Sequence, residues 1–256
     1  MILFYHQYGE GEPLIILHGL FGQSDNLTTV AKALGNDFNV YVMDQRNHGY
    51  SGHDETFNYD AMVNDLAETL DELKLSKIHL LGHSMGGKTA MFFAVKYPGR
   101  ILSLSVADIG PRYYRQHHQG IIEGLNALEL DELKSRSDAD SKLSKYIPEI
   151  GTRQFLLKNL YRTENQKFAW RFNILVISRE IENVGQEVIH EPVEIPALFY
   201  SGGNSRYIVD ADHEKIKSIF PLAEFAVMKN AGHWLHAENP VEFVRTIRSF
   251  ILKTED

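Results

Sequence analysis

The sequence predicts a single α/β domain, built on a mostly parallel, doubly wound sheet with a helical lid inserted before its last strands. Three observations predict it. Apolar, strand-like runs alternate with helix-like segments four times over the first 110 residues. The runs lead into loops rich in glycine or polar residues. Strand-like runs return only after a long, charged, helix-like stretch, which indicates an insertion into the domain.

Five apolar runs in the first 110 residues predict strands, and the segments between them predict helices. The strands are predicted at 2–8, 14–17, 38–43, 78–81 and 101–107, and the helices at 26–34, 59–73 and 88–97. The clearest helix is 59–73, in which Met62, Leu66 and Leu70 recur at helical spacing. The first strand alternates loosely and is expected at a sheet edge. The later strands are short and mostly apolar, as buried parallel strands are.

Residues 111–193 break this alternation. They contain no clear buried strand, and helices are predicted at 121–133, 142–147, 153–160 and 172–181. Strands are predicted again at 195–201 and 224–228, each followed by a helix, from about 210 and over 240–252. The expected organisation is a core domain formed by 1–110 and 194–256, with a helical lid over 111–193.

Composition narrows the class of protein. With 256 residues, 43% of them hydrophobic, the chain can bury a substantial core. A net charge of −8 without a Lys/Arg cluster argues against nucleic acid or an anionic membrane as a partner. The lack of cysteine excludes disulfides and thiolate metal sites. Neither a signal-peptide pattern nor an apolar run of about 18 residues is present, so a cytoplasmic protein that does not span a membrane is expected.

The motif Gly82-His83-Ser84-Met85-Gly86 joins the strand 78–81 to the helix 88–97. Such a strand-turn-helix holds its serine on a strained turn and raises the hydroxyl clear of the sheet, and the glycines leave room because they carry no Cβ. Ser84 is therefore the predicted nucleophile. The alternative is a chance match to five loosely specified positions, but the flanking strand and helix argue against it.

A serine hydroxyl needs a neighbouring base, and the base needs a carboxylate that orients it. Of the 12 histidines, His233 is the predicted base, because its loop directly follows the last strand and the nucleophile precedes it in the chain. Most of the others lie in a strand, in the lid or in the elbow itself. His18 and His48 lie in loops at the correct end of the sheet but precede Ser84, and they are expected to brace those loops through hydrogen bonds.

Acyl transfer also needs N–H groups aimed at the oxyanion of the tetrahedral intermediate. The usual donors are the residue after the nucleophile and one in the first strand-to-helix loop, which gives Met85 and Leu20. If the loop is shifted by one residue, the N–H of Phe21 instead of Leu20 is the second donor. Because the donors are backbone groups, residue identity says little, and a plain tight turn at 18–22 is the alternative.

The carboxylate is less directly indicated. In this arrangement the acid usually follows the next-to-last strand, but Asn204 and Ser205 stand there. Asp108 ends the strand after the nucleophile helix, a second position from which a carboxylate can reach the histidine. Asp210 and Asp212 lie where first-turn aspartates cap helices. Asp108 is therefore ranked above Asp210 as the acid.

These motifs, in this order, resemble those of the YbfF-type acyl esterases of the α/β-hydrolase superfamily. The matching blocks are 18–22, 44–51, 82–88, 108–109, 202–205 and 231–234, spread over essentially the whole chain. The blocks Arg46-Asn47-His48-Gly49 and Gly202-Gly203-Asn204-Ser205 are more specific than the elbow, which is common to the superfamily. The resemblance implies an α/β-hydrolase fold, with the acid at Asp108 and with Ser205 assisting it.

Substrate choice in such a protein is expected to lie in the lid, with aromatic residues as candidate walls. Phe155, Trp170 and Phe172 occur in segments similar to lid segments of that family. They are expected to line an apolar acyl pocket, since ligand sites are mostly apolar. Phe21 and Trp234 are further candidate substrate contacts. The alternative is that the lid aromatics only hold the lid together.

The sequence thus predicts a serine hydrolase that cleaves carboxylic esters or thioesters of small to medium acyl groups, with acyl-CoA among the candidate substrates. The expected partner is a small molecule, the chemistry requires no metal or organic cofactor, and the chain is expected to be a monomer or homodimer. One alternative is a lyase or carbon–carbon hydrolase on the same scaffold, because fold does not fix function. Another is a non-catalytic binding module, against which an intact Ser84 and His233 count.

Overall fold

A seven-stranded sheet forms the centre of the molecule in the computed structural model, which describes residues 1–255. Its strand order is β1-β3-β2-β4-β5-β8-β9; β1 pairs antiparallel with β3, and the other neighbours are parallel. The strands are β1 (Tyr5–Tyr8), β2 (Pro13–Leu17), β3 (Asn39–Met43), β4 (Ile78–His83), β5 (Ile101–Ala107), β8 (Ala197–Gly202) and β9 (Ala223–Met228). The parallel strands deliver their carboxyl ends, and the loops that follow them, to one edge of the sheet.

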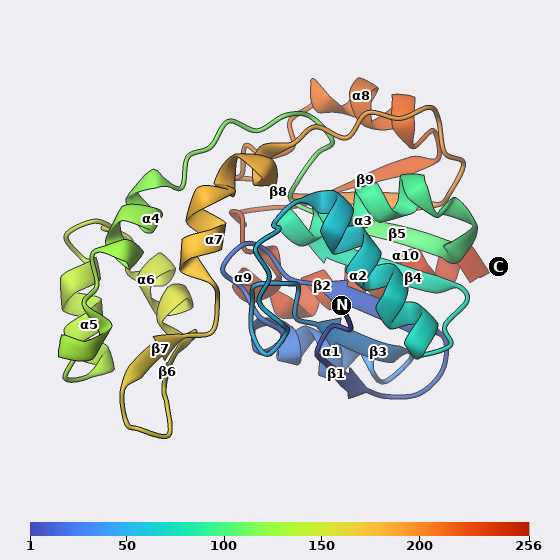
Figure 1. The fold of residues 1–256 in the computed structure, drawn as a ribbon. Coiled ribbons are helices and arrows are strands. Elements are labelled where there is room, and N and C mark those ends of the chain that lie inside the picture. Colours follow the sequence, from blue (N-terminus) through green and yellow to red (C-terminus); the bar gives the residue numbers. More distant parts are fainter. Residues whose placement is uncertain (256) are drawn as a thin grey trace.

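Helices cover both faces of the sheet (Figure 1). On one face, residues of α2, α3 and α8 share an apolar cluster with Ile15 and Leu17 of β2; on the other, residues of α1 and α10 share a cluster with Leu14 and Ile16. The core helices are α1 (Thr28–Leu34), α2 (Tyr59–Glu72), α3 (Met85–Lys96), α8 (Asp212–Ile219), α9 (Leu235–Glu238) and α10 (Pro240–Glu255). Alternate residues of one strand thus enter two cores, which confirms the predicted doubly wound α/β fold. No helix within residues 1–255 is both long and apolar enough to cross a membrane.

A separate lobe, coloured green to yellow in Figure 1, lies between β5 and β8 in the chain. It contains α4 (Gln119–Asn126), α5 (Arg136–Leu143), α6 (Ile150–Leu157), β6 (Leu160–Arg162), β7 (Phe168–Trp170) and α7 (Ile174–Arg179). Its apolar cluster includes Leu20, Phe21 and Met85, which belong to the predicted catalytic edge of the core. The lid therefore packs directly on the loops that carry the predicted chemistry.

The lid is not purely helical, which corrects the sequence-based prediction. β6 and β7 form an antiparallel hairpin, closed by a hydrogen bond from Thr163 N to Lys167 O at 2.8 Å. Each strand has only three residues, too few for a period of two to be recognised in the sequence. The helix predicted at 142–147 is also displaced, because α5 ends at Leu143. The domain boundaries at 110 and 193 stay predictions.

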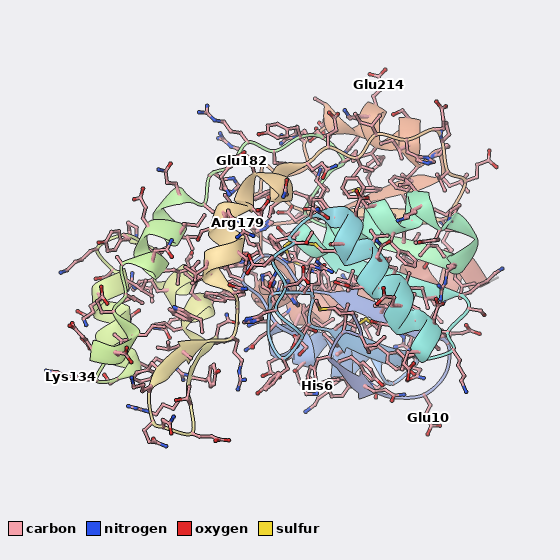
Figure 2. All side chains as sticks on the ribbon, viewed as in Figure 1. His6, Glu10, Lys134, Arg179, Glu182 and Glu214 are labelled. Atoms are coloured by element: carbon pink, nitrogen blue, oxygen red, sulfur yellow. The ribbon has the colours of Figure 1, made fainter. Side chains whose placement is uncertain are left out.

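Polar contacts supplement the apolar packing between lid and core. Arg179, labelled on the lid in Figure 2, pairs with Glu55 of the core at 2.8 Å. The pair is largely exposed, so it contributes little to stability. Asn183 donates a hydrogen bond from Nδ2 to the carbonyl of Phe57 at 2.9 Å and lies in a more protected position. The lid is attached at several points in addition to its two chain connections.

Candidate active site

Ser84 lies at the sharp turn between β4 and α3, with φ 53° and ψ −119°. This positive φ is strained for a residue other than glycine. The turn is possible because Gly82 and Gly86 bracket it: a Cβ on Gly82 would lie 2.2 Å from the carbonyl oxygen of Gly86, and a Cβ on Gly86 would lie 2.4 Å from that of Leu17. The local geometry is that of a nucleophile elbow, with the serine at its apex.

His233 connects the hydroxyl of Ser84 to a buried carboxylate. Its Nε2 lies 3.0 Å from Ser84 Oγ, and its Nδ1 lies 2.7 Å from Asp108 Oδ2. The Asp108 side chain is 0% exposed, whereas that of His233 is 25% exposed. Both distances are within hydrogen-bonding range, so a continuous Ser–His–Asp chain links the ends of β4, β5 and β9.

Asp108 follows β5 directly and has φ 52°, a second strained position. Its Oδ1 accepts a hydrogen bond from Gly202 N at 3.1 Å, and its Oδ2 accepts one from Ser205 Oγ at 2.5 Å. Ser205 thus lies beside the carboxylate, as the resemblance implied. Asp212 instead forms an ion pair with Arg112 at 3.0 Å, and within residues 1–255 Asp210 makes no contact with His233.

Two backbone amides near Ser84, those of Leu20 and Met85, have no acceptor among the described residues, and both residues line a cavity with Ser84. Met85 is the first residue of α3, so its N–H has no acceptor within the helix. Leu20 follows β2, and its N–H has no hydrogen-bond partner within residues 1–255. The N–H of Phe21 is already engaged, because it donates to His48 Nε2 at 3.1 Å. Leu20 and Met85 therefore remain the pair available to an oxyanion.

Similarity to known proteins agrees with this geometry. A family model described as the alpha/beta hydrolase fold matches residues 12–119. Esterase YbfF of Escherichia coli is 39% identical over 241 residues, which cover 93% of this chain and 92% of that protein. This chain belongs to the YbfF-type esterase family of the α/β-hydrolase superfamily. As a member of that family it is a hydrolase.

Other relatives extend the family. The sn-1-specific diacylglycerol lipase ABHD11 of Mus musculus is 37% identical over 249 residues, covering 93% of this chain and 80% of that protein. A solved structure described as a marine microorganism esterase is 42% identical, with a TM-score of 0.95, and the match covers 97% of this chain and 99% of that one. Fold and sequence therefore place the chain among esterases and lipases over nearly its whole length.

Buried side chains brace the loop at residues 18–22, which carries Leu20 and Phe21. Burial lowers the pKa of His48 to about 3, so its neutral ring accepts from Phe21 N while Nδ1–H donates to a backbone carbonyl at 2.9 Å. His18 Nε2 accepts from Gln45 N at 3.0 Å. These contacts confirm the expected bracing roles of the two histidines. Asn159, from the lid, adds a hydrogen bond to Phe21 O at 2.8 Å.

Contacts from three further side chains, which the sequence did not predict, hold His233 in place directly or through His83. His83 Nε2–H donates to the carbonyl of His233 at 2.8 Å, and burial lowers the pKa of His83 well below its usual value. His236 packs edge-on against His83, with ring centroids 4.6 Å apart. Tyr207 stacks on the His233 ring at 4.1 Å. Adjacency to Ser84 was the only signal for His83 in the sequence, and the structure places its Nε2 on the backbone of His233.

Two cavities meet at Ser84. The larger cavity has a volume of about 630 Å³, and its lining includes Phe21, Phe155, His233 and Trp234. The smaller cavity has a volume of about 410 Å³ and lies between α3 and the lid connections. Three of the five predicted substrate contacts thus line the larger cavity.

Trp170 and Phe172 line neither cavity, which corrects the expectation that they form its walls. Their rings stack with centroids 5.0 Å apart, and Phe172 meets the Phe21 ring edge-on at 5.3 Å. Both are buried, at 8% and 2% exposure. The hairpin directs this aromatic pair onto the back of the oxyanion loop. Their structural role is the alternative that the sequence left open, namely holding the lid in place.

Lys88 joins the nucleophile helix to both lid connections. Its side chain is completely buried, and its Nζ donates to the carbonyl oxygens of Pro111 at 3.0 Å, Arg112 at 2.6 Å and Gln186 at 2.7 Å. Three acceptors use all three donors of an ammonium group. Burial, and then the nearby positive charges of Arg112 and Lys215, lower the pKa of Lys88 to about 7. The group is therefore charged at mildly acidic pH.

Replacing Lys88 with methionine is expected to lower the free energy of unfolding by about 1–3 kcal/mol at pH 6, because three carbonyls lose their donor. Thermal unfolding followed by circular dichroism measures the change. Lys96→Met is the matched control, since Lys96 lies on the same helix but makes an exposed bond to Asn64. Equal melting temperatures for the two variants would show that the buried contacts contribute nothing.

Proposed function

We propose that this chain is a serine hydrolase that cleaves carboxylic esters of small molecules through an acyl-enzyme on Ser84. The observation that carries the proposal is the hydrogen-bonded chain from Ser84 Oγ through His233 to Asp108 Oδ2. An elbow serine, a histidine in reach of it and a buried carboxylate behind the histidine are the parts that acyl transfer needs. Esterase and lipase relatives support the substrate class.

In the acylation step, Ser84 Oγ attacks the ester carbonyl carbon as His233 Nε2 takes the hydroxyl proton. The negative charge formed on the carbonyl oxygen is stabilised by the N–H groups of Leu20 and Met85. Asp108 stabilises the imidazolium and fixes its orientation through Nδ1. His233 then gives the proton to the leaving oxygen, the carbon–oxygen bond breaks and an alcohol departs.

In the deacylation step, water replaces the alcohol. The water oxygen attacks the acyl carbon as His233 removes a proton from it, and the same two amides stabilise the tetrahedral intermediate. The bond from this carbon to Ser84 Oγ then breaks, Oγ takes the proton back from His233 and the carboxylic acid departs. A thioester undergoes the same steps with a thiol as the leaving group. Thioesters, including acyl-CoA, therefore belong to the proposed substrate range, and the protein supplies every catalytic group without a metal or organic cofactor.

Ser205 is proposed as an auxiliary partner of the carboxylate. Its hydroxyl donates a hydrogen bond to Asp108 Oδ2, the same oxygen that accepts the hydrogen bond from His233 Nδ1. The hydrogen bond helps to hold the carboxylate in position beside His233 Nδ1. The serine thereby strengthens the orientation of the base without taking part in proton transfer.

A fluorophosphonate probe tests the proposed function directly. The wild-type protein is incubated with the probe, digested and analysed by mass spectrometry, and one adduct is expected, on the peptide that contains Ser84. A parallel panel of aryl esters, acyl-CoA thioesters and vinylogous diketones separates ester hydrolysis from carbon–carbon bond cleavage. An unlabelled protein that turns over none of these compounds would be a binding module instead.

A further inference from the structure

The two cavities at Ser84 divide the candidate site into two arms. The larger and the smaller cavity share Ser84, Leu20, His118 and Tyr207, so these residues stand where the arms join. A substrate ester also has two arms, the acyl group and the alcohol, which meet at the carbonyl carbon. If Ser84 is the nucleophile, as proposed above, each arm of the ester must enter one of the cavities.

The position of His233, the proposed base, distinguishes the two cavities. His233 lines the larger cavity but not the smaller one. The ring must protonate the leaving oxygen, and proton transfer requires this oxygen within about 2.6–3.2 Å of Nε2. The alcohol is therefore on the side of the larger cavity when its bond to carbon breaks and the proton moves from His233 to its oxygen.

The position of the proposed oxyanion amides indicates where the acyl group lies. Met85 lines the smaller cavity but not the larger one, and its N–H is free to bind the carbonyl oxygen. With the oxygen at the amides and the alcohol beside His233, the acyl group is left with the smaller cavity. We propose that the smaller cavity binds the acyl group and the larger cavity binds the leaving alcohol or thiol.

The lining of the smaller cavity fits an acyl chain. Ile109, Ile181 and Val184 supply apolar walls, the last two from the lid segment that returns to the core. The ammonium donors of Lys88, which also lines this cavity, are used by three carbonyls. The first lid connection adds a polar side with Arg115, Gln116 and His117, so the alkyl chain is expected along the apolar wall. Phe155, which was expected in the acyl pocket, lines the larger cavity together with Trp234 and so moves to the alcohol side.

The test combines two variants, each of which fills one cavity, with two series of esters. Val184→Phe fills the smaller cavity, and Thr152→Phe, from α6, fills the larger one as the matched control. The first series is p-nitrophenyl esters from acetate to octanoate, which vary the acyl group. The second is butyrate esters of methanol through octanol, followed by pH-stat titration, which vary the alcohol.

Val184→Phe is expected to lower the octanoate-to-acetate ratio of kcat/KM about tenfold or more, because a bulky side chain in an apolar pocket discriminates by such factors. It should leave the ratio for octyl over methyl butyrate within about twofold, and Thr152→Phe should do the reverse. Val184→Ala, which enlarges the smaller cavity, should raise the octanoate-to-acetate ratio. This variant replaces Val184→Phe as the test if the phenylalanine variant does not fold.

The opposite pattern, with Val184 changing only the alcohol series, would overturn the assignment of the two arms. Equal changes in both series would overturn it as well, because the cavities would then not be separate arms. Either result leaves the proposed hydrolase function intact. Failure of the wild-type protein to hydrolyse either series would instead refute that function, so the two failures are distinguishable.

Discussion

Replacing Ser84 with alanine is expected to lower kcat for ester hydrolysis by a factor on the order of 10⁴ to 10⁶, the range found when single triad members are removed from other serine hydrolases. Alanine leaves His233 without a hydroxyl to activate, so no acyl-enzyme forms. The change is measured with purified protein on p-nitrophenyl esters, together with the loss of fluorophosphonate labelling.

The fold should survive this substitution, because the strained turn depends on Gly82 and Gly86 and not on the hydroxyl. Circular dichroism and the melting temperature check it. Ser141→Ala is the matched control, since Ser141 is an exposed residue of α5, far along the chain from the elbow. Full turnover by a folded Ser84→Ala protein, free of contaminating esterase, would end the proposed mechanism.

Replacing Asp108 with asparagine is expected to lower kcat by a factor on the order of 10⁴, by analogy with the same amide substitution in another triad. The amide retains the size of the side chain but carries no charge, so it cannot stabilise the imidazolium. Its NH₂ group can also favour the wrong tautomer of His233. Steady-state kinetics on a fixed aryl ester measure the loss.

The neighbouring residues give this prediction its controls. Ser205→Ala removes one neutral donor and should cost about tenfold, or about 1 kcal/mol. Asp210→Asn should change kcat little, since Asp210 makes no contact with His233 within residues 1–255. Ser205→Asp in the Asp108→Asn background is expected to restore part of the activity by moving the carboxylate to the next strand. Near-normal kcat in Asp108→Asn, with collapse in Asp210→Asn, would place the acid on the later loop.

The sequence predicted the core well because its signals are local. β5 runs over Ile101–Ala107, the predicted range, since a mostly apolar run between Arg100 and Asp108 leaves little freedom in its ends. The elbow is likewise determined by five consecutive residues. Ser84, Asp108 and His233 lie at the ends of three parallel strands, and the sheet brings such ends together.

The lid was predicted less well because its structure depends on distant contacts. The hairpin strands are too short to show a period, and Trp170 and Phe172 are directed by packing on Phe21, which no local pattern encodes. Lys88 and Asn159 were missed for the same reason: Asn159 lies 138 positions from its partner Phe21. A cytoplasmic location and a monomeric or homodimeric state stay predictions.

The position of the lid within the sheet has a consequence for folding. β5 pairs with β8, yet residues 108–196 separate these two strands. During synthesis, β5 is therefore an open edge strand until β8 has emerged after the lid, and such edges invite pairing with other chains. The entropic cost of closing a loop grows only slowly with its length, and a lid that has already packed its apolar residues against one another and against the core loops shortens the effective loop. Early lid folding would thus protect the nascent sheet from aggregation.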